Sequence, residues 1–150
     1  MANYYRRQPK DEFESKVIDI RRTARVVAGG RRFSFRAAVV VGDKKGSVGL
    51  GLAKSDDIAT AFEKATRQAK KNLLKVKLTK ENSIPRQVEA KFNSARVIIK
   101  PTKSHGLVAG SSVRTVLALA GIKGVSAKIL SRSKNKLNNA RAALKALQQL

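Results

Sequence analysis

The sequence predicts an α+β fold of two small domains, and three features of the 150-residue chain lead to this prediction. Strand-like alternation followed by a helical pattern fills residues 31–75. Turn-forming residues and Pro85 interrupt the chain at residues 76–86. A second series of strand and helix patterns, in the order ββαβα, then follows. A chain of this length forms one domain or two small ones, and the interruption favours two.

This division gives four segments. We expect residues 1–12, which are mostly polar, to form a flexible arm, and residues 13–75 to form the first domain. Residues 76–86 are the expected linker, and residues 87–150 the second domain.

The first domain is expected to be a βββα unit. Residues 13–27 have the pattern of one long strand with a bulge near Arg22, and residues 31–41 and 47–54 that of a hairpin. In the last of these strands the apolar residues alternate with Gly49 and Gly51, so one face lacks side chains. Such a face suits close approach by another backbone or by a ligand.

A helix is expected from Ser55 to Lys75. Ser55 suits the N-cap, and the next two residues are aspartates in the first turn, where the helix dipole favours negative charge. Cations recur at helical spacing on one face, at Lys64, Arg67, Lys71 and Lys75. This face is either an ordinary solvated surface or a contact for an anionic partner.

The second domain is expected to contain a hairpin, a helix, a strand and a closing helix. These elements are predicted at residues 87–92 and 95–100, 111–120, 125–130, and 136–150. Gly121 is expected to end the first of the two helices.

The net charge of +23, from 33 basic and 10 acidic residues, indicates an anionic partner. A small soluble domain typically carries a net charge of magnitude roughly 2–8. Both halves carry the excess, so both are expected to contact a polyanion such as a nucleic acid. A membrane is the competing polyanion, but no apolar run is long enough to span one, and we expect no membrane contact.

The glycine pair Gly29-Gly30, followed by Arg31 and Arg32, is the clearest candidate contact in the first half. A flexible backbone among cations can hold a phosphate or enter a nucleic-acid groove. The alternative is a plain hairpin loop with solvated arginines, and the net charge favours phosphate contact.

The sequence contains no clear motif for a catalytic site or for a cofactor site. The stretch from Gly49 to Lys54 begins like G-x-G-x-x-G but lacks the third glycine, and Asp56 and Asp57 would repel a phosphate there. The chain has no cysteine, and its one histidine, His105, has no evident partner for acid–base or metal chemistry. We therefore expect that the chain is not an enzyme and that it binds neither a metal ion nor a cofactor. No zinc finger or helix-turn-helix pattern is present, and two compact basic α+β units favour RNA recognised by shape and backbone.

The same residues closely resemble the bacterial small-subunit ribosomal protein S-five family. The resemblance runs from about Ile18 to Leu147 and rests on many spaced glycines and charges in the same order. In the first half they are Gly29-Gly30-Arg31, Phe33-Ser34-Phe35, Val39-Val40-Val41-Gly42-Asp43, Gly46-Ser47-Val48-Gly49-Leu50-Gly51 and Lys54; in the second, Pro101, Gly106, Ala109-Gly110, Arg114, Ala120-Gly121, Ala127-Lys128, Ser133, Asn135, Asn138 and Arg141-Ala142.

The resemblance implies a double-stranded-RNA-binding-like first domain and a cytoplasmic, ribosomal role. Family members bind small-subunit ribosomal RNA, steady the head of the subunit against its body near the mRNA entry path, and affect decoding accuracy. They touch the small-subunit proteins numbered four and eight, and the contact with protein eight depends on a tail usual after the last helix. Changes in the loop that is here Gly29, Gly30 and Arg31 give spectinomycin resistance in the family. The alternative is an RNA-processing enzyme or its basic RNA-binding subunit.

The candidate rRNA contacts are cations of both domains together with the glycine loop and two polar residues of the second domain. They are Arg21, Arg22, Arg25, Gly29, Gly30, Arg31, Arg32, Lys44, Lys45, Lys54, Lys64, Arg67, Lys71, Lys103, His105, Arg114, Arg132 and Asn135.

Overall fold

The computed structural model describes residues 12–79, 81–103 and 105–150, which form two antiparallel sheets and three helices. The elements, in chain order, are β1 (Glu14–Val27), β2 (Gly30–Gly42), β3 (Ser47–Ser55), α1 (Ile58–Lys71), β4 (Leu73–Lys75), β5 (Val88–Phe92), β6 (Ala95–Pro101), α2 (Ser111–Leu119), β7 (Val125–Ile129) and α3 (Lys136–Leu147). The first sheet has the order β1-β2-β3-β4 and the second the order β5-β6-β7. The α+β prediction is confirmed. The predicted flexible arm lies almost entirely outside the described residues.

Helix α1 packs directly on the glycines of β3. A Cβ atom added at Gly51 would lie 1.9 Å from the carbonyl oxygen of Ala65, and one added at Gly49 would lie 2.3 Å from that of Ala69. The backbone of α1 therefore packs on the strand face that lacks side chains. The sequence predicted that either another backbone or a ligand would approach this face. On the neighbouring strand Ala37, Val39 and Val41 complete this small core.

The ends of α1 differ from the prediction. Asp57, rather than Ser55, is the N-cap, and its carboxylate accepts hydrogen bonds from the N–H groups of Ala59 and Thr60. The Ser55 hydroxyl instead accepts a hydrogen bond from the Thr60 hydroxyl. The helix ends at Lys71, not Lys75, because residues 73–75 form β4 and pair with the start of β3.

The bulge in β1 also lies elsewhere than predicted. The pairing with β2 shifts between Val17 and Asp19, whereas Arg22 pairs with Phe35 in regular register. The extra residue is Ile18, which packs against the larger of the two cores. An irregularity inside this core was not visible in the local alternation of residues 13–27.

The second sheet has α2 and α3 on one face, as the ββαβα prediction requires. Asn93 takes a positive φ of 51° in the tight turn of the predicted hairpin. Helix α2 ends at Leu119, and Gly121 follows with a φ of +82°.

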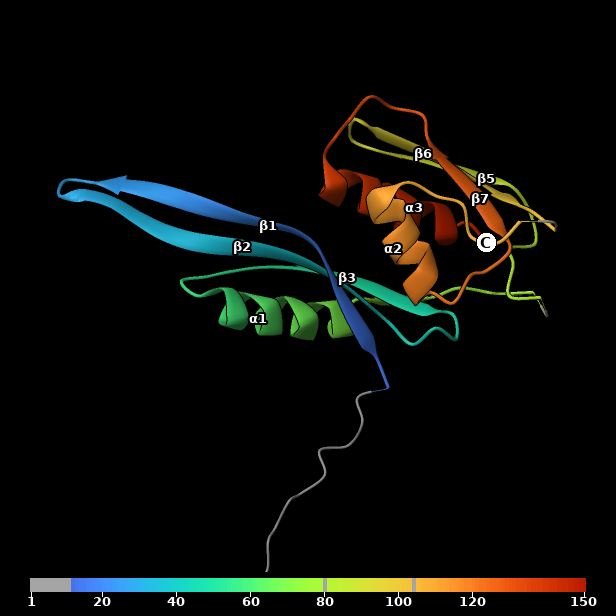
Figure 1. The fold of residues 1–150 in the computed structure, drawn as a ribbon, viewed down its shortest axis with the longest axis horizontal. Helices are drawn as coiled ribbons and strands as arrows, with labels where there is room; N and C mark the ends of the chain where they lie inside the picture. Colours follow the sequence, from blue (N-terminus) through green and yellow to red (C-terminus); the bar gives the residue numbers. More distant parts are fainter. Residues whose placement is uncertain (1–11, 80, 104) are drawn as a thin grey trace, which may run out of the picture.

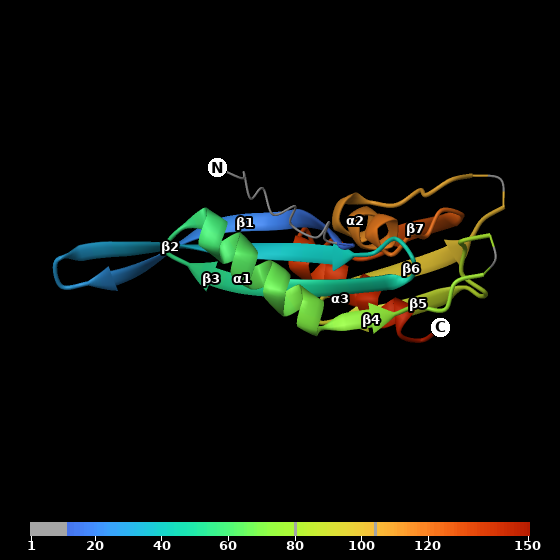
Figure 2. The ribbon, with the colours of Figure 1, turned by 90° about the horizontal axis from the view of Figure 1, so that it is seen from below.

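The two sheets share one core. Val40 and Val48, on the face of the first sheet opposite α1, lie in the same buried cluster as Val113, Val116 and Leu117 of α2. The layers are therefore α1, the first sheet, the helices α2 and α3, and the second sheet, which Figures 1 and 2 show from two sides.

Backbone contacts fix the turn between β2 and β3 against the end of α2. The N–H of Lys44 donates to the carbonyl oxygen of Leu119 (3.0 Å), and that of Gly46 donates to that of Ala120 (3.0 Å). Gly42 is required here because a Cβ would lie 2.2 Å from the Leu119 oxygen. The predicted boundary at residues 76–86 stays a prediction, and Val76 and Ile84 from this segment are buried in the shared core.

The far ends of β1 and β2 extend past the rest of the molecule as a two-stranded hairpin (Figure 1). Between Gly30 and Ser34, β2 does not pair with β3, so in this part of the hairpin each strand has a neighbour on one side only. Most side chains from Arg21 to Arg32 are exposed. The fold therefore places the loop at Gly29 and Gly30 at the end of a long projecting hairpin.

Candidate nucleic-acid interface

Positive side chains lie opposite one another along one face of the hairpin. Arg21 pairs with Arg36, which in turn pairs with Lys54 of β3, and Arg25 pairs with Arg32. Side chains alternate along a strand, so these five share the face opposite α1, and we call this set the arginine face. Like charges directly opposite in a sheet destabilise it. An anion that neutralises them removes this cost.

Arg36 is the member of the arginine face that the sequence analysis missed. It is half-buried and directly follows Phe35, in a stretch where the local pattern indicates only a strand. The signal that identifies it is the register across three strands, because only that register places it between Arg21 and Lys54.

The hairpin loop consists of Ala28 and Gly29 between the paired residues Val27 and Gly30. Gly30 has a φ of +139°, which side chains rarely allow. A Cβ at either glycine would have nothing within 4 Å, so the loop is open to an approaching partner. Arg31 and Arg32 follow it and are exposed.

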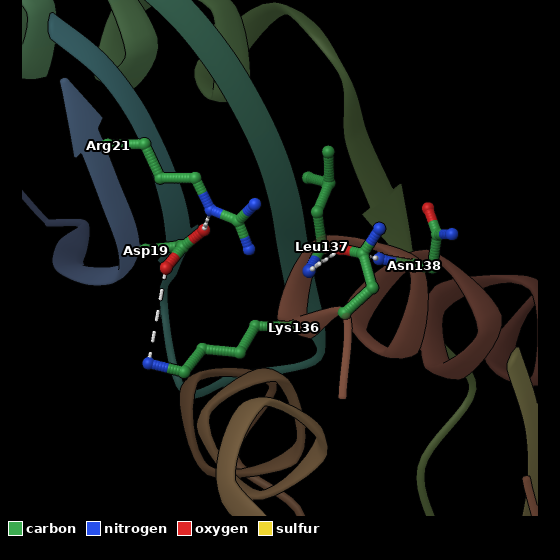
Figure 3. A network of polar contacts seen from close by, with 6 residues as sticks. Asp19, Arg21, Lys136, Leu137 and Asn138 are labelled. Atoms are coloured by element: carbon green, nitrogen blue, oxygen red, sulfur yellow. Dashed lines mark hydrogen bonds and ion pairs between the residues drawn. The ribbon is translucent and has the colours of Figure 1, made fainter. Parts of the chain in front are cut away.

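Asp19 connects the arginine face to α3. Its carboxylate lies 2.8 Å from Nε of Arg21 and 4.0 Å from Nζ of Lys136, as Figure 3 shows. Asn135 caps the same helix end, and its side-chain oxygen accepts hydrogen bonds from the N–H groups of Leu137 and Asn138. This oxygen is therefore used by the fold, and a contact of Asn135 with RNA would come from its amide nitrogen.

The outer face of α1 carries Lys64, Arg67 and Lys71, which are all exposed. Lys64 also donates to the Ser55 hydroxyl at 3.3 Å. Because α1 covers the opposite side of the sheet from the arginine face, these cations form a second, separate surface.

The turn at residues 43–47 holds Lys44 and Lys45. Asp43 orders this turn, since its Oδ1 accepts hydrogen bonds from the N–H groups of Lys45 (2.7 Å) and Ser47 (2.9 Å). Burial raises the pKa of the Asp43 carboxyl, but these hydrogen bonds outweigh it, so the pKa lies below its usual value. Both lysines are exposed, and Lys44 forms an ion pair with Glu14.

The predicted contacts of the second half are spread over α2, two loops and the start of α3. Arg114 lies on α2 and lines a cavity of about 560 Å³ together with Lys16, Lys44 and Glu14. Lys103 and His105 are exposed on the loop after β6, and Arg132 is exposed on the loop before α3. The structure therefore gathers the hairpin residues but does not bring all the predicted contacts into one site.

Four further cations line the uncovered face of the second sheet. They are Lys91, Arg96, Lys100 and Lys128, all of them exposed. Arg96 is paired with Glu89. The alternation within each strand could have identified this set, because each cation directly follows or precedes an apolar residue that faces the core, such as Ala90, Val97, Ile99 and Ala127.

The described part of the structure shows neither a metal site nor a membrane-spanning helix. Residues 12–79, 81–103 and 105–150 contain no group of three His, Cys, Asp or Glu side chains placed to hold a metal ion. Over the same residues, none of the helices combines the length and apolar character needed to cross a bilayer.

Comparison with known families decides the identity of the chain. Residues 13–77 match the family described as ribosomal protein S5, N-terminal domain, and residues 90–150 match ribosomal protein S5, C-terminal domain.

The chain belongs to the ribosomal protein S5 family.

Individual members are similar over nearly the whole chain. The small ribosomal subunit protein uS5c of Cyanophora paradoxa is 46% identical over 145 residues, covering 96% of this chain and 85% of its own. The small ribosomal subunit protein uS5 of Gloeobacter violaceus is 49% identical over 146 residues, covering 97% of this chain and 65% of its own. That of Prochlorococcus marinus (strain MIT 9215) is 49% identical over 140 residues, covering 93% and 68%.

Membership of the ribosomal protein S5 family answers two of the sequence predictions. The family consists of structural ribosomal proteins, so the prediction that the chain is not an enzyme is confirmed and the RNA-processing alternative is set aside. A ribosomal location is confirmed in the same way. The individual rRNA contacts stay predictions.

Proposed function

We propose that this chain is a structural constituent of the small ribosomal subunit and binds small-subunit rRNA. The observation that carries the proposal is the match to both S5 domains along nearly the whole chain. The arginine face supports it physically, because phosphates neutralise like charges that the sheet holds opposite one another. The net charge of +23 favours the same partner.

A finer role in holding the head of the subunit against its body, and in decoding accuracy near the mRNA entry path, is part of the proposal. It is supported by the shared core, which joins the first sheet, from which the hairpin extends, to α2, α3 and the second sheet. A stiff body with cations on several sides suits the bridging of separate RNA segments. The proposed protein partners are the small-subunit proteins numbered four and eight.

The proposed rRNA contacts are the eighteen residues predicted from the sequence, with Arg36 added. Among them, Gly29, Gly30 and Arg31 are proposed to lie near the spectinomycin site of the rRNA. The openness of the loop supports this, because a partner can approach the backbone of either glycine without a clash.

Co-sedimentation with ribosomal subunits tests the proposal. The full chain, expressed with an affinity tag in a bacterium, is expected to sediment with the small subunit on a sucrose gradient and to remain there at moderate salt. As a control, a variant with Arg21, Arg25, Arg32 and Arg36 all changed to Gln should be enriched in the free pool. Recovery of the unaltered chain only in the free pool would refute the proposal.

A further inference from the structure

The hairpin has a second face, opposite the arginine face, and this face is largely apolar. It carries Ile20, Ala24, Val26, Phe33 and Phe35, which the register places side by side on the α1 side of the sheet. We call this set the apolar strip. Three of its members are well exposed: Val26 at 76%, Phe33 at 46% and Ile20 at 45%.

The apolar strip continues the surface that α1 covers closer to the body. Ala37, Val39 and Val41 of β2 are buried beneath α1, and Phe35 and Phe33 follow at the same two-residue spacing. Helix α1 begins only at Ile58, beside the end of β3, and the hairpin projects beyond it (Figure 1). The strip therefore lies in water in the isolated chain, and burying apolar surface is worth roughly 25 cal/mol per Å².

The side chains around the apolar strip indicate what occupies it. The Arg22 guanidinium lies over the Phe33 ring, 4.4 Å from its centre, and both belong to this face. Arg31 also lies on this face, and residues 22–36 contain no carboxylate. An occupant must therefore offer a flat or apolar surface together with negative charge. Bases stack on aromatic rings and on guanidinium planes, and each nucleotide of RNA also brings a negatively charged phosphate.

We propose that the apolar strip binds an unpaired nucleotide of RNA, whose base stacks on the Phe33–Arg22 pair. Arg31 lies on the same face, two residues before Phe33 and opposite Val26, where it can bind the phosphate of that nucleotide. The hairpin thus contacts RNA in two ways, by charge on the arginine face and by stacking on the apolar strip. This inference rests on the proposed function, since it assumes that the partner is rRNA.

Tryptophan fluorescence gives a direct test, because the chain contains no tryptophan. The probe is a transcript of the small-subunit rRNA, added to the full chain carrying Phe33→Trp. Stacking of a base on the indole is expected to quench its emission as the RNA binds. The matched control is Phe92→Trp, because Phe92 also lies beneath an arginine, Arg141 at 5.4 Å, but is in the second sheet and packs against the core. Its emission should change little.

Binding of the same transcript by Phe33→Ala supplies the second measurement. Its affinity is expected to fall about 5- to 150-fold, the range for loss of one base stack, while the salt dependence of binding stays unchanged. Thermal unfolding of the free variant checks that it folds, and Phe33→Trp keeps the test valid if it does not.

Three outcomes would overturn the inference. Tight, salt-dependent binding without quenching, with Phe33→Ala as strong as the unaltered chain, would show that rRNA binds but not at the apolar strip. Quenching by small-subunit proteins and not by the transcript would identify the strip as a protein contact. Failure of the unaltered chain to bind the transcript at all would refute the proposed function itself.

Discussion

At the scale of the residue, the pairing of Arg25 with Arg32 should act in opposite directions on the stability of the free chain and on the proposed binding of rRNA. Both side chains are exposed, and they face each other across β1 and β2. Opposed like charges cost a sheet stability, yet two guanidinium groups side by side form a strong site for phosphate. This arrangement is expected where selection acts on the complex rather than on the free chain.

Changing Arg25→Gln should therefore stabilise the free chain and weaken its binding to rRNA. The free energy of unfolding is expected to rise by about 0.2–1 kcal/mol, because the repulsion is removed. The salt slope of RNA binding should fall by about one unit through the loss of one phosphate contact. Urea denaturation and binding at several salt concentrations measure the two effects, with Arg25→Lys as the control that keeps the charge. An unchanged salt slope would mean that Arg25 does not touch phosphate.

Asp43 gives a second prediction at this scale, concerning acid. Its pKa is lowered below 3.8 in the folded chain, so its carboxylate stabilises the turn at residues 43–47 at pH values above that of the unfolded group. This contribution should be lost as the pH falls through the lowered pKa. Amide exchange at Lys45 and Ser47, whose N–H groups bond to Asp43, should accelerate there relative to other amides. In Asp43→Asn the two amides should show no such step, and a step that persisted would assign it to another group.

At the scale of the element, the contact between α1 and β3 explains why glycine alternates along that strand. The helix backbone lies so close that any side chain at Gly51 would meet the Ala65 carbonyl oxygen. The helix contributes alanines to the same contact, at Ala61, Ala65 and Ala69. Because the residues at this contact are small on both elements, the axis of α1 lies close to the sheet. This packing also sets the distance between the sheet and the cationic outer face of α1.

The substitution Gly51→Ala should destabilise the chain because the added methyl group would lie 1.9 Å from a backbone atom. We expect a loss of roughly 1–3 kcal/mol, the usual cost of overpacking, or more because backbone has to move. Gly29→Ala is the matched control, since its Cβ would have nothing within 4 Å. The midpoint of urea unfolding measures both. Equal midpoints for the two variants would contradict the close packing of α1.

The sequence predicted these elements well where local patterns determine them and less well where tertiary contacts do. The alternation at Gly49 and Gly51 indicated a bare strand face, and the turn at Asn93 and the helix end at Gly121 follow from local chemistry. Ser55 and Asp57 are both good N-cap residues, so composition alone could not separate them. The strand at residues 73–75 depends on pairing with β3, a partner more than twenty residues away in sequence. Arg36 could be assigned to the arginine face only from the register of β1, β2 and β3.

At the scale of the whole molecule, the shared core makes the two sheets one mechanical unit. Gly121 lies where the end of α2 meets the turn between β2 and β3, with a φ of +82° and with the Lys44 carbonyl oxygen 2.1 Å from the position of its absent Cβ. The end of α2 therefore depends on the turn of the first sheet, and the turn depends on α2.

Gly121→Ala should consequently destabilise both halves together. Hydrogen exchange is expected to accelerate in the first sheet as well as in the second, and unfolding should remain a single transition. Gly106→Ala is the control, because its Cβ would have nothing within 4 Å. Faster exchange confined to the second sheet would show that the two halves are energetically independent.

If the projecting hairpin lies against rRNA in the assembled subunit, as proposed, site-directed crosslinking from its tip should detect the contact. The chain has no cysteine, so Gly29→Cys provides a unique attachment point for a photo-crosslinker at the open tip, and Lys145→Cys on α3 provides a comparison site. After assembly into small subunits, irradiation of the Gly29→Cys protein is expected to yield crosslinks to a defined segment of the small-subunit rRNA. Assembled subunits in which that position gives no RNA crosslink, or crosslinks only to protein, would show that the hairpin does not lie against rRNA.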